Sequence, residues 1–375
     1  MLDTPSRAND RHKPDEKAQQ QPDGRVFLGG KDNPLLAPRG VHLVNGKLLV
    51  ADTGQNRIFI WNNLPTQSYQ EPDVVLGQVE KQHTDRNAGG KVNASTLMYP
   101  SGVWSDGTRL VVCDAWNHRV LIWNDWPTTD GQPADTVLGQ PDFNHNEPNV
   151  KGVGATPSAQ SLNWPYGVDF SDGKLFVADT GNRRVLVFHQ WPTENSAAAD
   201  QVIGKRDFAD RDYDPTQPIW PYSVKVGPDG EIAITDTQYY RVLLFKSLAS
   251  ATDPDTLPTI IGQPAIDANG QNQFRWFPEA NTLNWCYDTI FYKGGIFVAD
   301  TGNSRVLRFD TLPSQNNQPA DSLLGQGTFN LGIENRNSIK ASPNSLYWPF
   351  HLAIDNGVLA IADTGNHRVV LYPIY

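Results

Sequence analysis

The chain has 375 residues, of which 38% are hydrophobic and 19% charged, so it is long enough and apolar enough to bury a large core. Its net charge of −10 disfavours binding driven by the phosphate backbone of a nucleic acid, which requires clustered Lys and Arg. With 31 Gly and 28 Pro, the composition favours many short strands joined by turns, and hence an all-β fold.

The first segment, residues 1–24, is polar and rich in Pro, Gln and charged residues, which predicts a disordered leader. It lacks the apolar run of a signal peptide, and no stretch of the chain reaches the roughly 20 apolar residues of a membrane helix. We therefore expect a soluble, cytoplasmic protein, unless an export signal has been lost. Cys113 and Cys286 stand where sister segments carry Ala or Pro, so we expect small buried residues and no disulfide.

From residue 25 onward, one pattern recurs six times. VADTGNRRVLVF at residues 177–188 is one copy, and variants begin at residues 50, 112, 234, 298 and 361. In every copy an Asp is followed five residues later by an Arg, and successive copies lie 57 to 65 residues apart. Each unit also has an apolar strand ending in Gly, such as VVLGQ from residue 74, and a segment such as NWPYGV from residue 163 that opens the next unit. Each unit therefore predicts four short strands.

Repeats of this length with four strands predict a β-propeller, in which each sheet covers its faces with the neighbouring sheets. Six units predict six blades. The last unit ends at RVVLYPIY without a fourth strand, whereas RVFLGG at residues 25–30 is a strand without a blade. We therefore expect a single all-β domain over residues 25–375, in which the N-terminal strand completes the last blade and closes the ring.

These units resemble the NHL-repeat family, whose repeats run Pro-x-Gly-Ile, then Val-x-Asp-x-Gly-Asn-x-Arg, then an apolar strand. The resemblance extends from about Val26 to Tyr375 and implies a six-bladed propeller. One departure is the segment between LGQ and the following WP, which is longer than in a minimal repeat. Long ordered loops of this kind are often functional.

The recurring Asp and Arg are interpreted as structural. The Asp ends a strand and can accept backbone N–H groups of its own turn, and the Arg can reach that carboxylate or a nearby carbonyl. A catalytic set is needed once, whereas these residues occur in every unit. The predicted structural turn clips are Asp52, Arg57, Asp114, Arg119, Asp179, Arg184, Asp236, Arg241, Asp300, Arg305, Asp363 and Arg368. His118 and His367, inside two of these turns, are expected to face solvent.

Positions where some units depart from the others are candidates for function. At one slot of the inner strand the first three units carry Gly and the last three do not. The departures and two neighbouring residues define a candidate site in the central channel: Ser223, Lys225, Asp288, His351 and His42. Asp288 and His351 are also candidate ligands of a divalent metal, zinc or calcium, that would polarise a substrate oxygen or acidify a water. The alternative is that both hydrogen-bond each other or backbone groups between blades.

Aromatic residues form a second candidate surface. Rings precede the inner strands in most units, and the fourth unit replaces the TGN of the turn by TQYY. Such rings can stack on a sugar, a peptide or another planar ligand, and packing between blades is the alternative. The candidate ligand-face aromatics are Tyr239, Tyr240, Trp164, Trp220, Trp285 and Trp348.

Three functions remain open, because one fold hosts many activities. A binding or scaffold module would hold a protein, peptide or glycan through its loops. A metal-assisted lyase or hydrolase is the alternative, because peptidylglycine amidating lyase resembles an NHL ring with histidine-bound zinc, and gluconolactonase-like rings hold calcium. RNA binding, as in the NHL domains of tripartite-motif proteins, is disfavoured by the net charge.

Overall fold

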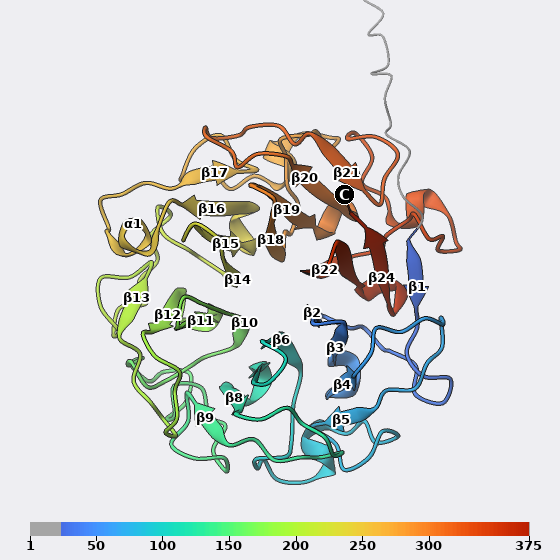
Figure 1. The fold of residues 1–375 in the computed structure, drawn as a ribbon. Helices are drawn as coiled ribbons and strands as arrows, with labels where there is room; N and C mark the ends of the chain where they lie inside the picture. The colour runs from blue at the N-terminus through green and yellow to red at the C-terminus, as the bar shows by residue number, and fades with distance from the viewer. Residues whose placement is uncertain (1–23, 375) are drawn as a thin grey trace, which may run out of the picture.

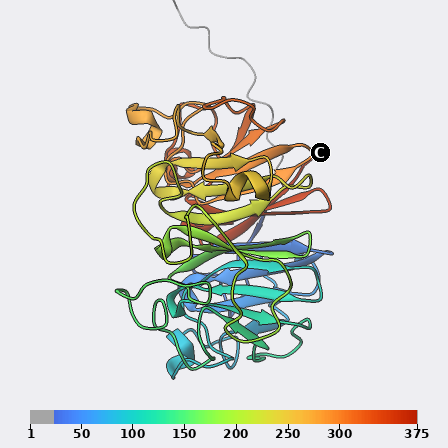
Figure 2. The same ribbon diagram turned by 90° about the vertical axis from the view of Figure 1, so that its left-hand side faces the viewer.

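The computed structural model describes residues 24–374 and consists of six four-stranded antiparallel sheets arranged as blades around one axis (Figure 1). The expected all-β, six-bladed propeller is thus confirmed. In the side view the strands run across the thickness of the disc (Figure 2). The predicted leader lies outside the described residues except for Gly24, which is buried against Val370 and Tyr372.

Each blade runs from an inner strand at the axis to an outer strand at the rim. The strands of blades 1 to 3 are β2 (Gly40–Val44), β3 (Lys47–Asp52), β4 (Arg57–Trp61) and β5 (Val74–Leu76); β6 (Pro100–Ser105), β7 (Leu110–Asp114), β8 (Arg119–Trp123) and β9 (Thr136–Leu138); and β10 (Pro165–Ser171), β11 (Lys174–Asp179), β12 (Arg184–Phe188) and β13 (Gln201–Ile203). Those of blades 4 to 6 are β14 (Pro221–Val226), β15 (Ile232–Asp236), β16 (Arg241–Phe245) and β17 (Thr259–Ile261); β18 (Asp288–Tyr292), β19 (Gly295–Asp300), β20 (Arg305–Phe309) and β21 (Ser322–Leu324); and β22 (Pro349–Asp355), β23 (Val358–Asp363), β24 (Arg368–Pro373) and β1 (Arg25–Phe27).

Helical structure is confined to short segments. A 3-10 turn joins the second and third strands of every blade: η1 (Thr53–Gln55), η3 (Ala115–Asn117), η4 (Thr180–Asn182), η5 (Thr237–Tyr239), η7 (Thr301–Asn303) and η9 (Thr364–Asn366). Three more such turns, η2 (Arg86–Gly89), η6 (Gln271–Phe274) and η8 (Glu334–Asn337), lie in connections between blades, and the helix α1 (Leu248–Thr252) follows β16.

The two faces of the disc carry different connections. The turns from the inner to the second strand, such as residues 45–46, lie on one face, which we call the hairpin face. The Asp-to-Arg turns and the long connections between blades, such as residues 77–99, lie on the opposite face, which we call the loop face. Each inner strand therefore starts at the loop face and ends at the hairpin face.

The core is divided into six apolar clusters, each between two neighbouring blades. Strand β3 shows how sequence alternation builds them, because Leu48 and Val50 pack toward blade 6, whereas Leu49 and Ala51 pack toward blade 2. Successive side chains of a strand point to opposite faces, so an uninterrupted apolar run covers both sides of a blade. A blade has no core of its own, and its stability depends on its neighbours.

The N-terminal strand closes the ring, as expected. β1 pairs antiparallel with β24 and becomes the outer strand of blade 6, beside it in Figure 1. Phe27 of β1 is buried and packs edge-on against Trp61 of β4, with ring centroids 4.8 Å apart. This residue therefore joins the last blade to the first.

A similar set of hydrogen bonds holds the Asp-to-Arg turn of every blade. In blade 3, one oxygen of Asp179 accepts from the backbone N–H of Asn163 at 2.7 Å, and the other accepts from Arg184 Nε at 2.7 Å. Arg184 Nη2 donates to the Ser161 carbonyl in the loop before the blade, and Nη1 donates to the Phe208 carbonyl in the loop after it. We call this set the Asp–Arg clamp.

The clamp recurs with little variation. All six carboxylates accept the Arg and a backbone N–H from the loop before the blade. In blades 1 to 5 the Arg also binds a carbonyl of the loop after the blade. Each clamp therefore ties its turn to the loops of the loop face.

Replacing Phe27 by Ala tests the closure. The substitution removes a buried ring between blades 6 and 1, so we expect the free energy of unfolding to fall by about 3 to 5 kcal/mol. Arg25→Ala, on the exposed start of the same strand, is the control and should change it little. Chemical denaturation measures both, and equal midpoints for the two variants would contradict closure by β1.

Candidate functional site

The inner strands place three successive layers of side chains along the axis. The first layer, nearest the loop face, consists of Arg39, Ser101, Tyr166, Tyr222, Tyr287 and Phe350. The second is the slot with the Gly departures: Gly40, Gly102, Gly167, Ser223, Asp288 and His351. The third, nearest the hairpin face, consists of His42, Trp104, Asp169, Lys225, Ile290 and Ala353. The candidate channel residues from the sequence are thus divided between the second and third layers.

The first layer forms an axial aromatic cluster. Tyr222 stacks on Tyr166 with ring centroids 4.6 Å apart, and meets Tyr287 edge-on at 4.6 Å. Tyr287 lies 4.1 Å from Phe350, and the Arg39 guanidinium lies 4.3 Å above the Phe350 ring. Because the contacting rings come from four blades and the guanidinium from a fifth, they meet at the axis. The strand pairing shifts register at the start of β10, β14 and β22, next to the first-layer residues. Such an irregularity can redirect a side chain, here toward the axis.

In the second layer, the close approach of neighbouring strands explains the Gly residues of blades 1 to 3. A Cβ atom at Gly40 would lie 2.0 Å from the Ser101 carbonyl oxygen of blade 2. At Gly102 and Gly167 the corresponding carbonyl oxygens of the next blade would lie 2.7 and 2.6 Å away. Any larger residue would have to separate these blades.

The last three blades use the same slot for polar contacts. Asp288 Oδ2 accepts from the backbone N–H of Leu352 in blade 6 at 2.9 Å, and His351 Nδ1 contacts the Val41 carbonyl of blade 1 at 3.0 Å. The Asp288 and His351 side chains are 3.5 Å apart. Burial raises the pKa of Asp288 and lowers the pKa of His351, so the imidazole is neutral at pH 7. Nδ1 lies closer to the Val41 carbonyl, at 3.0 Å, than to the Val41 N–H, at 3.4 Å, which favours an Nδ1–H that donates to the carbonyl. Ser223 contacts Thr235 within its own blade at 3.0 Å, and its hydroxyl also lowers the pKa of Asp288 in the next blade by hydrogen bonding.

These residues do not fit a metal ion. Each ring has one nitrogen bonded to a backbone carbonyl, and the two histidines lie in different layers, His351 in the second and His42 in the third. Within residues 24–374 no three His, Cys, Asp or Glu side chains are grouped to hold a metal. The positive charge of Lys225 also acts on Asp288 and His351, which disfavours a second cation beside them.

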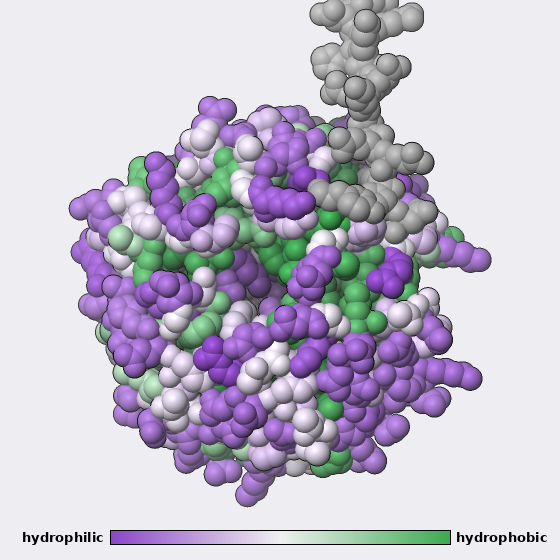
Figure 3. Space-filling view, viewed as in Figure 1, coloured by the Kyte–Doolittle hydropathy of each residue, from purple (hydrophilic) through white to green (hydrophobic). Residues whose placement is uncertain are grey.

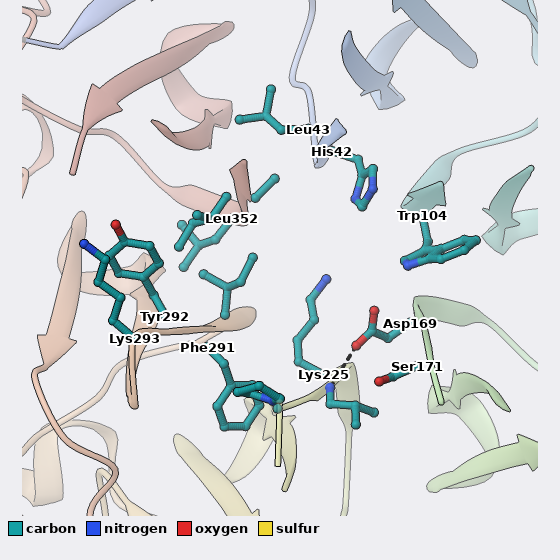
Figure 4. A pocket seen from close by; sticks show the side chains of 16 residues that line it. His42, Leu43, Trp104, Asp169, Ser171, Lys225, Phe291, Tyr292, Lys293 and Leu352 are labelled. Atoms are coloured by element: carbon teal, nitrogen blue, oxygen red, sulfur yellow. Dashed lines mark hydrogen bonds between the residues drawn. The ribbon is translucent and has the colours of Figure 1, made fainter. Parts of the chain in front are cut away.

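The third layer lines a cavity of about 410 Å³ in the centre of the ring (Figure 4). Lys225 and His42 of the candidate set line it, whereas Ser223, Asp288 and His351 do not. Its walls extend to Ser171 and Lys293 at the ends of inner strands, so it lies toward the hairpin face. The space-filling view shows the molecule hollowed near the centre of the ring (Figure 3).

Charged and polar groups face one another across this cavity. Asp169 Oδ2 accepts from the backbone N–H of Val226 at 2.8 Å. Burial raises the pKa of Asp169, and the charge of Lys225 opposes the shift. Burial lowers the pKa of His42 to about 4, so that the ring is neutral at pH 7.

Comparison with known proteins supports the repeat assignment. No protein-family model matches the chain. NHL repeat-containing protein 2 of Gallus gallus is 28% identical over 158 residues, which is 40% of this chain and 19% of that protein. This partial match and the six blades support an NHL-repeat β-propeller. The match spans less than a fifth of that relative's length, 19%, so the activity of the whole relative is not implied for this chain.

Several solved structures are similar to the chain at low sequence identity. A structural genomics protein of unknown function from Bacteroides thetaiotaomicron has a TM-score of 0.51 at 12% identity, over 93% of this chain and 75% of that one. Hydrazine synthase of Kuenenia stuttgartiensis follows with 0.47 at 14%, over 90% and 96%, and streptogramin B lyase with 0.46 at 12%, over 93% and 96%. At 12% identity, the first similarity concerns the fold alone.

The candidate aromatics of this propeller differ in their exposure, and Trp164 contacts Trp220 with ring centroids 6.1 Å apart. Trp164, Trp285 and Trp348 are each about half-exposed where the loops enter the inner strands. Tyr240 adopts a left-handed conformation and meets Trp285 edge-on, with ring centroids 5.4 Å apart. Tyr239 is buried below the Arg241 guanidinium, whose carbon lies 4.5 Å from the ring centre, and Trp220 is half-buried.

The two turn histidines differ, and the expectation for His118 is wrong. His367 is exposed, as expected, whereas His118 is buried and its Nδ1 accepts from the backbone N–H of Trp164 in blade 3 at 3.1 Å. Asn56 makes the equivalent contact through Oδ1, which accepts from Tyr99 at 3.0 Å. Both contacts join one blade to the next, and burial lowers the pKa of His118 to about 4.

Sequence reasoning also missed two groups of residues. Trp104 and Asp169 occupy the same repeat position as His42 and Lys225, so comparing the repeats at that position would have identified them. The exposed side chains around Trp276 had no such signal, because that loop varies between repeats.

His118→Asn tests the buried histidine with the residue that blade 1 uses. Since the pKa in the folded state is below the unfolded value of about 6.5, the unfolded chain binds the proton first as the pH falls. The wild type therefore loses stability between pH 6.5 and about 4, and the variant should lose about 2 kcal/mol less over this window. Denaturation at pH 7 and 4.5 measures this, with exposed His367→Asn as control; an equal acid loss in wild type and His118→Asn would contradict a neutral buried His118.

Proposed function

We propose that this propeller is a non-catalytic binding module whose partner is a protein or peptide with an apolar face, docking on the loop face beside blades 5 and 6. The observation that carries the proposal is the exposure of three large side chains in one loop. Phe274 is 84% exposed, Trp276 97% and Phe277 69%. Exposed apolar groups of this size commonly mark interaction sites in folded proteins.

A second loop extends the same surface. Leu331, Ile333 and Ile339, in the connection before blade 6, are also exposed. The two loops touch, because a Cβ atom at Gly332 would lie 3.2 Å from Pro278 Cγ. We call these six residues the outer loop patch: Phe274, Trp276, Phe277, Leu331, Ile333 and Ile339.

Hydrogen bonds hold the base of the loop that carries Phe274, Trp276 and Phe277. Asn272 and Asn303 exchange side-chain hydrogen bonds of 3.1 and 2.8 Å, and Gln273 donates to the Asn281 carbonyl at 2.9 Å. Asn272, Gln273 and Phe274 all have positive φ, which presents the next residues outward. A loop held in this way loses less conformational entropy on binding.

The composition of the patch favours a protein partner over a glycan. Three of its residues are aliphatic, and aliphatic side chains pack on apolar protein surfaces but offer no ring for stacking on a sugar. The half-exposed Trp164, Trp285 and Trp348 supply such rings and make a glycan the second candidate. No helix in residues 24–374 is long and apolar enough to cross a membrane. The cytoplasmic location expected from the sequence stays a prediction.

The proposal predicts that peptides selected from a displayed library on the wild type depend on the outer loop patch. Replacing Phe274, Trp276 and Phe277 together by Ser should weaken such a peptide by about thirtyfold or more, because exposed aromatics supply much of an interface's energy. Leu257→Ser, an exposed apolar residue of the hairpin face, is the control and should bind as the wild type.

Calorimetry on the selected peptide measures these affinities, and thermal unfolding verifies that the variants fold. Equal peptide affinity for wild type and the triple variant would overturn the proposal. If the library yields no binding peptide, and the wild type binds a glycan that Trp285→Ser does not bind, the glycan alternative would replace the peptide proposal.

A further inference from the structure

The central cavity contains a buried cation without a partner in the described part of the chain. Lys225 is 8% exposed, and its side chain extends into the cavity (Figure 4). Its ammonium group makes no hydrogen bond to any of residues 24–374, and no carboxylate oxygen of these residues lies within the 4.0 Å of an ion pair. Asp169 and Asp288 act on it only from beyond that distance.

An ammonium group in this position is suited to an anionic ligand. Lysine is almost never buried unless it is paired, because removing the charge from water carries a large free-energy cost. The cavity has room for a small molecule, because its volume of about 410 Å³ is in the ordinary range of ligand pockets.

Other groups of the third layer complete a recognition set. Trp104 faces the cavity, and its indole N–H makes no hydrogen bond to the described residues (Figure 4). Because His42 Nε2–H donates to the Ser105 carbonyl, its Nδ1 is an acceptor. Ile290 and Phe291 supply apolar wall. The cavity thus offers two donors, one of them charged, beside an acceptor and an apolar surface.

We propose that the central cavity binds a small hydroxy-monocarboxylate, whose carboxylate accepts from Lys225 Nζ and Trp104 Nε1 and whose hydroxyl donates to His42 Nδ1 or Asp169. A carboxylate is the anion that two convergent donors suit. A single negative charge is favoured, because Lys225 extends into the cavity, whereas Lys293 lies at its end with Nζ over the Tyr292 ring. The carboxylates of Asp169 and Asp288 also repel a second negative charge. This site is separate from the outer loop patch, which lies on the opposite face.

The probe is 3-phenyllactate, whose ring suits the apolar wall, with 3-phenyllactamide and inorganic phosphate as comparisons. Calorimetry should show saturable binding of the carboxylate and at least tenfold weaker binding of the amide and of phosphate. The amide lacks the negative charge, whereas phosphate carries more than one charge on average and lacks the apolar ring. No binding of 3-phenyllactate, or equal binding of the amide, would overturn the proposal.

Lys225→Met should weaken 3-phenyllactate by roughly tenfold or more, because it removes a charge-assisted hydrogen bond at similar side-chain length. Lys174→Met is the matched control, since Lys174 lies at the hairpin face but outside the cavity and pairs with Asp172. Equal affinity in wild type and Lys225→Met overturns the proposal.

Trp104→Phe retains an aromatic side chain but removes the indole N–H donor. This variant tests the proposed carboxylate site if Lys225→Met does not fold. We expect several-fold weaker binding of 3-phenyllactate, and unchanged binding would overturn the proposal. The triple Ser variant of the outer loop patch should bind 3-phenyllactate as the wild type does, and Lys225→Met should bind the selected peptide normally. Failure of one proposal is therefore distinguishable from failure of the other.

Discussion

The Asp–Arg clamp is the interaction on which the rest of the structure depends. A buried ion pair alone is often no more stabilising than apolar residues of the same volume. Here, however, the guanidinium also pairs carbonyl groups from loops on either side of its blade, as Arg184 does with Ser161 and Phe208. Without it, those buried carbonyls and the carboxylate would be left unpaired, which is far more costly than losing the ion pair itself. The clamp thus holds the long polar connections between blades in one ordered arrangement on the loop face.

The ring combines this uniform framework with an asymmetric centre. In blades 1 to 3 the inner strands approach so closely that only Gly fits the second layer. In blades 5 and 6 the same position holds Asp288 and His351, which replace that close contact by hydrogen bonds to the next blade. The departures therefore have a structural explanation. The third layer has no such explanation, because Lys225 is buried without a partner among residues 24–374.

Much of the fold was predictable because the same residues recur at equivalent positions in each of the six units. The constant Asp-to-Arg spacing predicted six blades, and the unpaired strand at residues 25–30 predicted the closure, since each strand of a propeller needs a neighbour. The site was less predictable. The sequence does not show how closely β2 and β6 approach, which decides whether a slot admits a side chain.

Burial also depends on neighbours that sequence order does not reveal. His118 was expected to face solvent from its turn, but the loop entering blade 3 covers it and donates to its ring. Trp276 lies in a loop of no fixed pattern, and its exposure follows from how Asn272 and Asn303 hold the loop base. In both cases the deciding contact joins residues about 30 or more positions apart in the chain.

Hydrogen exchange in Arg305→Met tests the central claim most directly. Arg305 donates to the Thr282 carbonyl before blade 5 and to the Phe329 carbonyl after it, so a single clamp serves both loops of the outer loop patch. If the clamps order the loop face, amides of residues 269–283 and 327–346 should lose protection together, while the loops flanking Arg119 stay protected. Unchanged exchange in both loops, or a loss confined to one, would contradict the account.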